Sequence, residues 1–393
     1  MEVEDGRHFR NDFDEAAKPA DWEVKLRTAL EAAKTTVLEA EHRKGSIYTG
    51  AGGVAYMLLH LVACGIEDPH AASAASEILM EAEAQSDARR VTFLEGLAGC
   101  VALQAWTQSL LGKPEKVQER LRKLERLAER AAALPDGECE VLYGRCGFLS
   151  AVLFLRQRLD DRQLLSQSAT ELVRQVVASG QRSAQDGWPL YFEWHEKCYL
   201  GGAHGIAGIL NILLQFPQEL ATAGRDASDL VRATAEKLLD HRFVSGNLPS
   251  SLGSGKDRLV QFCHGATGAV PLMLRMASVY KEPRYLQQAK ELGEVIWRRG
   301  LLSTKGLGLC HGTPGNGFAL LTIYKRTEDE KWLNRALHFA VFACDHQRDL
   351  VAQADRPHSL FEGLAGAACF WGSVLRAATR DTATAGFPCY DFD

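Results

Sequence analysis

Two short motifs place potential metal ligands directly before glycine-rich helix starts. Residues 310–315 are Cys-His-Gly-Thr-Pro-Gly, and residues 263–268 are Cys-His-Gly-Ala-Thr-Gly. An apolar segment follows each motif. Cysteine sulfur and histidine nitrogen are ligands that Zn²⁺ prefers in proteins. Two cysteines and at least one histidine at equivalent places therefore predict one shared zinc site.

Cys263, Cys310 and His311 fit the ligand set of a catalytic zinc site. Adjacent residues of a regular helix diverge, so Cys310 and His311 must lie in the loop before the helix to reach one ion. A zinc ion with three protein ligands keeps a fourth position for water or substrate. A structural site would need a fourth ligand, for which His264 is the only nearby candidate. Alternatively, the cysteines are unligated and buried, as free cysteines often are.

The predicted ligand set suits the activation of a thiol. Two thiolates cancel the charge of Zn²⁺, so an incoming thiol can be held deprotonated at neutral pH and remain nucleophilic. His204, which precedes a further Gly-x-x-Gly pair, could protonate the enolate formed when the thiolate adds to an activated alkene. We place His264 beside it as a second acid/base candidate. The alternative for His204 is a hydrogen-bonded histidine without a chemical role.

Gly-x-x-Gly recurs along nearly the whole chain. The pairs are Gly50/Gly53, Gly96/Gly99, Gly144/Gly147, Gly205/Gly208, Gly265/Gly268, Gly312/Gly315 and Gly363/Gly366. Each pair precedes a segment that is apolar on nearly every face, which must be buried on all sides if it is helical. Amphipathic segments precede these apolar ones, at residues 22–41, 69–84, 114–134, 160–179, 227–241, 283–299 and 331–346.

This repeat predicts an all-α fold. Seven pairs of an outer amphipathic helix and an inner apolar helix close into an α/α toroid, a double α-barrel. We expect one domain over residues 1–393, with a short N-terminal arm over about residues 1–20. If the repeats are equivalent, the residues before the first glycines form a ring at one end: Thr49, Glu95, Tyr143, His204, His264, His311 and Glu362. Three histidines and two carboxylates in one ring make a candidate reactive site.

Composition narrows the function class. A formal net charge of −5 argues against nucleic acid as a partner. No apolar run reaches the roughly 20 residues of a membrane span, and no apolar region follows the acidic first residues as a secretory signal would require. We therefore expect a cytoplasmic protein without a transmembrane segment, which would reach the plasma membrane only peripherally, through a partner.

The ten cysteines are expected to be mostly reduced. They are spread over a long chain without a signal peptide, and no Cys-x-x-Cys occurs. Cys64, Cys100, Cys146 and Cys369 lie in apolar segments, where a free cysteine behaves as a small buried hydrophobic residue.

The motifs resemble those of the lanthionine synthetase C-like family. The likeness rests on Ala203-His204-Gly205-x-x-Gly208, Cys263-His264-Gly265-x-x-Gly268 and Cys310-His311-Gly312-x-x-Gly315-Asn316, and it covers essentially the full chain. Other segments, such as Arg7-x-Phe9-x-Asn11 and the closing Phe387-Pro388, are similar to the eukaryotic branch and, within it, to the third paralogue. The resemblance implies the seven-repeat toroid, zinc held by Cys263, Cys310 and His311, and His204 as acid/base.

The resemblance also implies a substrate. Bacterial relatives add peptide cysteines to dehydroalanine or dehydrobutyrine and close thioether rings, whereas eukaryotic relatives are associated with adding glutathione to dehydroamino acids in damaged proteins. Lys305 and Arg7 match positions implicated in glutathione contact, where cations could pair with its carboxylates. Gln261-Phe262 replaces the His-Trp that animal relatives usually carry before Cys263. Glu95 occupies a position that varies within the family, and either difference could alter substrate preference or weaken turnover.

Two other functions stay open at this point. α/α toroids also host inverting glycosidases with paired carboxylates, for which Glu95 and Glu362 are candidates. That function leaves Cys263, Cys310 and His311 without a role. The second alternative is a non-catalytic adaptor that binds zinc and glutathione and engages signalling proteins.

Overall fold

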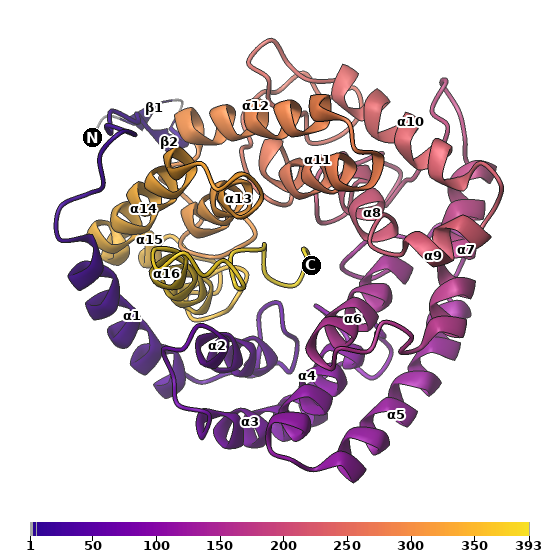
Figure 1. Cartoon of the computed structure of the whole chain (residues 1–393), viewed down its shortest axis with the longest axis horizontal. Helices are drawn as coiled ribbons and strands as arrows, with labels where there is room; N and C mark the ends of the chain where they lie inside the picture. The colour runs from indigo at the N-terminus through magenta and orange to yellow at the C-terminus, as the bar shows by residue number, and fades with distance from the viewer. Residues whose placement is uncertain (1–2, 5, 393) are drawn as a thin grey trace.

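Two concentric rings of helices make up the molecule (Figure 1). The structure is a computed structural model that describes residues 3–4 and 6–392. The outer ring contains α1 (Trp22–Glu39), α3 (Ala71–Gln85), α5 (Pro114–Ala132), α7 (Ser166–Arg182), α10 (Ala227–Asp240), α12 (Pro283–Arg299) and α14 (Glu330–Asp345). The inner ring contains α2 (Ala51–Ala63), α4 (Leu97–Leu110), α6 (Arg145–Arg158), α8 (Ile206–Leu213), α11 (Ala266–Tyr280), α13 (Thr313–Thr327) and α16 (Leu364–Ala377). The predicted toroid of seven helix pairs is confirmed.

The remaining elements are short. They are α9 (Pro217–Thr222), α15 (Gln347–Ala352) and an antiparallel hairpin of β1 (Val3–Glu4) and β2 (His8–Phe9). The sequence pattern predicted no strands. The hairpin lies before α1, and the chain there is fixed to the ring because Phe9 donates to the carbonyl of Leu301 and Asn11 donates to that of Trp297. Residues 1, 2, 5 and 393 of the predicted domain lie outside the described residues.

Burial follows the predicted apolar pattern. Every residue of α8 is buried, whereas α5 buries one face through Val117, Leu124 and Leu127. One predicted boundary is wrong, because the outer helix expected from residue 160 begins at Ser166. Asp160 and Leu165 adopt left-handed backbone conformations, with φ of 51° and 53°, which a right-handed helix does not accommodate.

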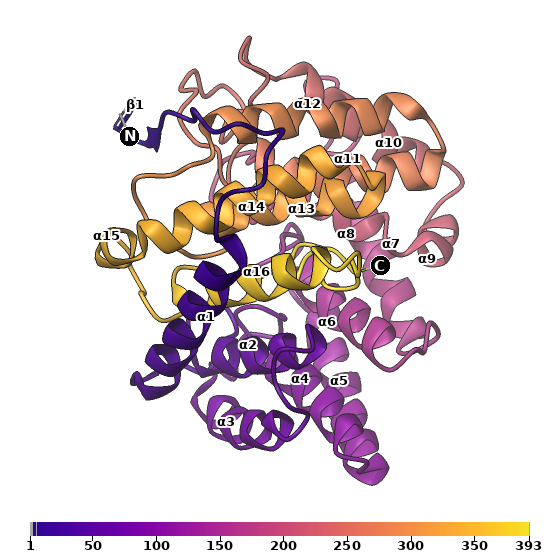
Figure 2. The same ribbon diagram turned by 60° about the vertical axis from the view of Figure 1, so that its left-hand side comes forward.

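The ring is closed by its first helix. α1 packs against α14 and α16 of the last repeat, as Figure 2 shows. The N-terminal and C-terminal thirds of the chain therefore form one continuous wall. No repeat has an uncovered inner helix among the described residues.

The glycine pairs start the inner helices. The first glycine of each pair is the N-cap residue of an inner helix. At the second glycine, the loop folds back so closely that a Cβ would meet a carbonyl oxygen, at 2.0 Å for Gly315 and Leu309 and at 2.3 Å for Gly268 and Phe262. The same contact recurs at all seven pairs. The repeat therefore encodes a tight loop that only glycine allows.

These seven loops are joined into a closed circle, which we call the mouth of the barrel. Backbone N–H groups donate to the next loop at Tyr48→Leu94, Phe93→Gly147, Val141→Ala203, Gly202→Phe262, Cys263→Cys310, Cys310→Phe361 and Phe361→Tyr48, over 2.8–3.4 Å. The links follow chain order and the last returns to the first. The candidate residues predicted from equivalent repeat positions thus lie on one hydrogen-bonded ring.

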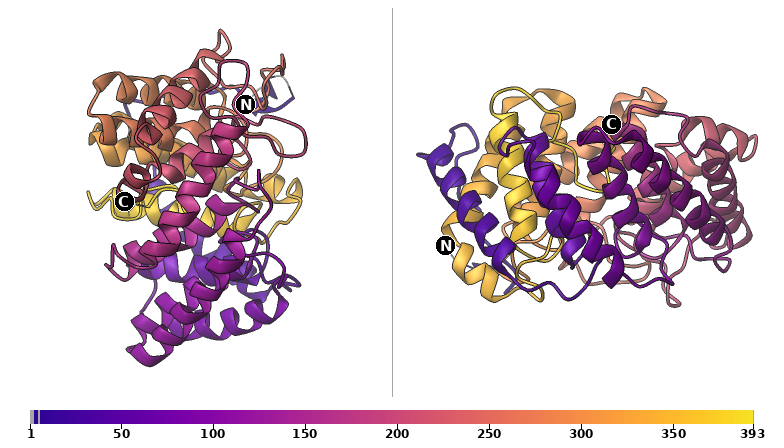
Figure 3. Two further views of the ribbon diagram at one scale, coloured as in Figure 1. Left: turned by 90° about the vertical axis from the view of Figure 1, so that its right-hand side faces the viewer. Right: turned by 90° about the horizontal axis from the view of Figure 1, so that it is seen from below.

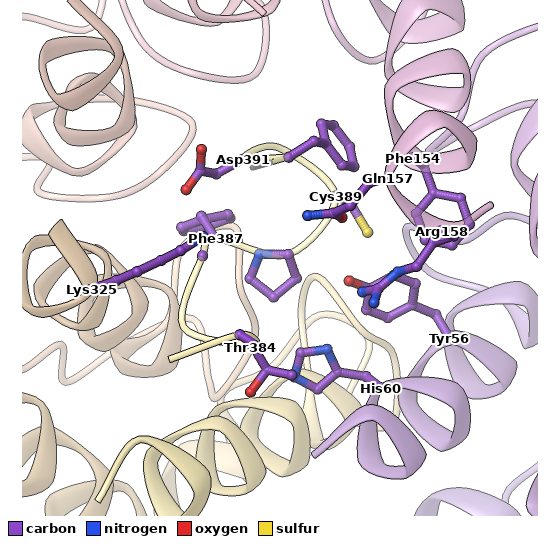
Figure 4. A pocket seen from close by; sticks show the side chains of 14 residues that line it. Tyr56, His60, Phe154, Gln157, Arg158, Lys325, Thr384, Phe387, Cys389 and Asp391 are labelled. Carbon is purple, nitrogen blue, oxygen red and sulfur yellow. The ribbon is translucent and has the colours of Figure 1, made fainter. Parts of the chain in front are cut away.

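The opposite end, which we call the far end, is closed by the last residues of the chain. They turn back among the ends of the inner helices (Figure 3). Phe387 and Cys389 lie between His60 of α2, Arg158 of α6 and Lys325 of α13, as Figure 4 shows. The cavity between these residues is about 20 Å³, enough for a single water molecule.

Candidate metal centre and active site

Cys263, Cys310 and His311 converge at the mouth. One ligand atom from each residue lies within 4.8 Å of the others. The loops before α11 and α13 carry them, and the backbone bond from Cys263 to Cys310 holds the two loops together at 3.4 Å. His264 does not belong to this group, so the fourth-ligand position considered for it has no support.

The donor set fits a zinc ion. The Nε2 atom of His311 is buried without a hydrogen-bond partner, so a polar ligand atom is left available. Burial and the neighbouring Cys263 raise the pKa of the Cys310 thiol well above its ordinary value. A cation is therefore required to hold both sulfurs as thiolates at neutral pH.

Tyr48 contacts the same centre from the first repeat. Burial, together with the nearby Cys310 and Cys263, raises the pKa of its hydroxyl, which therefore keeps a proton to donate. Its ring stacks on Phe361 at a centroid distance of 4.7 Å. Both residues belong to the hydrogen-bonded circle, which fixes their backbones relative to Cys310.

His204 is held by a carboxylate that the sequence analysis missed. Its Nδ1 lies 2.8 Å from Glu140 Oε2. Glu140 is 2% exposed and also accepts the backbone N–H groups of Leu142, Tyr143 and Gly144. Because an ionised carboxylate only accepts hydrogen bonds, Nδ1 carries a proton and Nε2 is the atom left for proton exchange.

Three aromatic side chains pack around the imidazole of His204. The indole of Trp194 is parallel to the imidazole, with centroids 3.9 Å apart and an interplanar angle of 3°. Tyr143 lies parallel to both rings, and Tyr199 lies 6.0 Å from His204 and 5.6 Å from His264. The two histidines therefore lie against one cluster of aromatic rings.

The sequence model of the lanthionine synthetase C-like family matches residues 41–390. The chain belongs to this family. A zebrafish (Danio rerio) relative named glutathione S-transferase LANCL1 is 35% identical over 376 residues, which cover 93% of this chain and 90% of the relative. The LanC-like protein GCL1 of Arabidopsis thaliana is 36% identical over 308 residues, which cover 74% of this chain and 69% of that relative. These relatives agree with the predicted eukaryotic branch, whereas the third paralogue stays a prediction.

The fold is shared with a solved bacterial structure. Nisin cyclase superposes with a TM-score of 0.67 over 92% of this chain and 95% of its own, at 13% sequence identity. At that identity the likeness concerns the LanC-type toroid and not the chemistry. Among residues 3–4 and 6–392, no helix combines the length and apolar character that crossing a lipid bilayer requires.

His264 lies near His204 and Tyr199 but is not one of the three clustered ligand residues. Its Nδ1 is buried without a hydrogen-bond partner. Burial, with the nearby charge of His204, lowers its pKa to about 4, so the imidazole is neutral at pH 7. A neutral imidazole with an unpaired nitrogen can form a hydrogen bond to a substrate.

The backbone of Arg7 lies beside the loop that carries Lys305. The backbone carbonyl of Arg7 accepts from the N–H of Ser303 at 2.9 Å, which brings the arm beside the loop that carries Lys305. Lys305 pairs with Asp355 at 2.7 Å, and both side chains are about half exposed. The charge of Lys305 acts on His311, so the cation stands near the metal cluster.

Of the two carboxylates considered for a glycosidase, Glu95 has a basic partner in its own loop. Glu95 pairs with Arg90 at 3.3 Å, and burial raises its pKa. The backbone N–H of Glu362 donates to Ser359 Oγ in its own loop. The charge of Glu362 contributes to the raised pKa of Glu95, but no hydrogen bond joins the two carboxylates among the described residues.

Gln261 and Phe262, which differ from the usual family residues, both contact the metal loop. The amide oxygen of Gln261 accepts a hydrogen bond from Cys263 Sγ at 3.5 Å. The Phe262 ring stacks on Phe387 of the far-end segment, with centroids 4.7 Å apart. The substitutions therefore alter the surroundings of Cys263 and leave the three clustered residues intact.

A register signal could have revealed Glu140. It stands four residues before the first glycine of its repeat, a position that Ser46 and Ser359 occupy in two others. Those serines accept a backbone N–H of their own loop, and Glu140 does the same while its second oxygen reaches His204. Trp194 lies in a loop outside the repeat, so it has no equivalent position in the other repeats that could have indicated a role.

Proposed function

We propose that this protein adds the thiol of glutathione to dehydroalanine or dehydrobutyrine residues of proteins or peptides, in a zinc-dependent reaction that forms a thioether. The proposal rests on one observation: a cluster of two cysteines and a histidine shares the mouth with a histidine oriented by a buried carboxylate. The name of the zebrafish relative supports glutathione as the thiol.

We assign Cys263, Cys310 and His311 as the residues that would hold zinc. When bound, zinc supplies the positive charge that keeps a thiol deprotonated at neutral pH. Tyr48 donates a hydrogen bond to Cys310 and thereby moderates the negative charge on that sulfur.

His204 supplies the proton that completes the addition. A bond forms between the glutathione sulfur and the β-carbon of the alkene, and the π electrons move toward the carbonyl as an enolate. The α-carbon then takes the proton of His204 Nε2, and the proton lost by the thiol restores the imidazolium. Glu140 keeps Nδ1 protonated and the ring oriented throughout. His264, which is neutral, is proposed to hydrogen-bond the substrate with its unpaired nitrogen.

Arg7 and Lys305 are proposed to bind the carboxylates of glutathione. The backbone of Arg7 bonds the loop that carries Lys305, and Lys305 would exchange its exposed partner Asp355 for the substrate. Cytoplasmic location, and membrane or signalling contacts through a partner, stay predictions.

One assay can distinguish the proposed thiol addition from the two competing functions. Purified protein is incubated with glutathione and a dehydroalanine peptide, and the adduct is measured by mass spectrometry before and after zinc is removed by a chelator and restored. We expect adduct formation that is lost with zinc and regained with it. Zinc content without any adduct would favour the adaptor, whereas chelator-insensitive glycan hydrolysis would favour the glycosidase and contradict our proposal.

A further inference from the structure

A tight hairpin projects from the loop between α7 and α8. Trp194 and Lys197 pair in an antiparallel bridge, with backbone N–H···O distances of 3.0 and 3.2 Å in the two directions. The two residues between them, His195 and Glu196, both have positive φ, at 49° and 61°. Two successive left-handed residues define a type I′ turn, which usually takes Asn-Gly. This turn therefore lacks the favoured pair, and Glu196 in particular is a residue type that rarely adopts a positive φ.

The base of the hairpin is anchored and its tip is exposed. Tyr199 bridges to Ser251, and the N–H of Leu200 donates to the carbonyl of Ser250 at 3.2 Å. The side chains of residues 195–197 are exposed, so they do not contribute to the core. Strained turns persist where the surrounding structure holds them, and they concentrate at functional sites.

The hairpin places the side chain of Trp194 against His204, the candidate general acid. The indole of Trp194 covers one face of His204 at 3.9 Å, while Glu140 holds the Nδ1 edge of the same imidazole. Tyr143 adds a further parallel ring, 5.9 Å from Trp194. One hydrogen bond alone leaves an imidazole free to tilt about the bond, whereas a stacked ring removes that freedom. Together the two contacts fix both the plane of the ring and the direction of Nε2.

We propose that Trp194 is a positioning residue for His204 and that the strained 194–197 hairpin exists to place it. The indole holds the imidazole in the plane that aims Nε2 at the alkene, and it shields the proton on that ring from water. This role rests on the proposed function of His204. Trp194 itself does not transfer a proton and does not touch the metal cluster.

The test compares Trp194→Leu, which removes the aromatic ring, with Trp194→Phe, which keeps a flat ring in the same place. We expect kcat to fall roughly tenfold for the leucine variant and to recover within about threefold for phenylalanine. Zinc content and the KM for glutathione should not change, because neither depends on the plane of His204. An unchanged kcat for Trp194→Leu, or no recovery with phenylalanine, would overturn the proposal.

A second readout does not require turnover. In protein labelled at histidine, the indole ring current should shift the His204 ring protons upfield, with assignment by difference from His204→Gln. This shift should disappear in Trp194→Leu, and the Nδ1 proton bound to Glu140 should exchange faster with water. If the wild type forms no adduct, the function of the site is wrong, yet these signals still decide whether Trp194 positions the ring. Identical spectra would overturn that positioning.

The matched control changes the tip of the hairpin and leaves Trp194 in place. The substitution Glu196→Gly supplies the glycine that a type I′ turn prefers at this position, and it keeps the His195 ring, which packs on the Trp194 indole at 4.2 Å. We expect unchanged kcat and an unchanged His204 spectrum. A loss of activity in this variant would show that the tip side chains, and not the indole, carry the effect, and would contradict the proposal.

Discussion

The mouth and the far end of the barrel contain the same residue types but differ in what those residues can do. Both ends hold buried cysteines and a histidine. The mouth has Cys263, Cys310 and the half-buried His311, and the far end has Cys64, Cys369, Cys389 and the buried His60. Within residues 3–4 and 6–392, only the mouth set brings ligand atoms to metal-binding distance. At the far end, His60 bonds Ser373 at 2.8 Å and Cys64 donates to Thr384 at 3.5 Å.

The difference lies in the backbone that carries each residue. The mouth residues lie in loops tied into a closed circle of hydrogen bonds, which turns their side chains toward a shared point. Cys369 lies inside α16, where it packs as an apolar side chain. Burial raises the pKa of Cys64 to about 11 and lowers that of His60 to about 3, so both stay neutral at pH 7. Loop register, and not residue type, distinguishes the candidate centre.

The largest expected effect comes from exchanging one cysteine at a time. Cys310→Ala should lose zinc and reduce the rate of glutathione addition roughly a thousandfold, because a ligand and its charge are removed. The matched control Cys369→Ala should keep both. Zinc content is measured by mass spectrometry, and the rate of glutathione addition is measured by the adduct assay. The comparison fails if Cys310→Ala keeps its zinc or if Cys369→Ala loses it.

A smaller loss is expected when the orientation of His204 is disturbed. Glu140→Gln removes the charge that keeps Nδ1 protonated, and kcat should fall roughly a hundredfold with zinc content intact. Ser46→Ala changes the equivalent position of the first repeat, which has no histidine partner, and should leave kcat within about twofold. Steady-state kinetics would be measured on both variants. A fall in kcat for Ser46→Ala as large as that for Glu140→Gln would contradict this account.

At the far end, pH should affect stability and not chemistry. The folded-state pKa of His60 is lowered to about 3, below its ordinary 6.5, so its contribution to stability is complete above pH 6.5 and falls as the pH drops toward 3. The slope approaches about 1.4 kcal/mol per pH unit, because only the unfolded chain takes up the proton. His60→Leu should unfold in urea with a shallower pH dependence between pH 6 and 5. Equal slopes in the two proteins would contradict the assignment.

The smallest effect concerns the segment that closes the far end. The hydroxyl of Tyr390 donates to the carbonyl of Gly268 at 2.9 Å in a fully buried setting. Tyr390→Phe leaves that carbonyl without this donor and should lower the free energy of unfolding by about 1 kcal/mol, measured by urea denaturation. Zinc content and kcat should remain at wild-type values. A loss of zinc would show that the two ends are not independent.

The sequence predicted the elements that follow a strict register and missed those that do not. The spacing of the glycine pairs predicted seven helix pairs and placed Cys263, Cys310 and His311 at one end of the barrel, as observed. Glu140 was missed because two other repeats carry at this position a serine that only caps its own loop. Trp194 reaches His204 through a type I′ turn that lacks the Asn-Gly signature of such turns, so no local pattern could reveal it. The closure of the far end by Phe387 and Tyr390 depends on contacts with helices that lie far away in sequence.

Zinc X-ray absorption spectroscopy on the purified wild-type protein tests the central claim most directly. We expect about one zinc per chain, with two sulfur neighbours at about 2.3 Å and at least one nitrogen neighbour at about 2.0 Å. One sulfur neighbour should be lost in Cys263→Ala, and none in Cys64→Ala. A protein without zinc, or a zinc ion surrounded only by nitrogen and oxygen, would contradict the assignment of the mouth as the reactive centre.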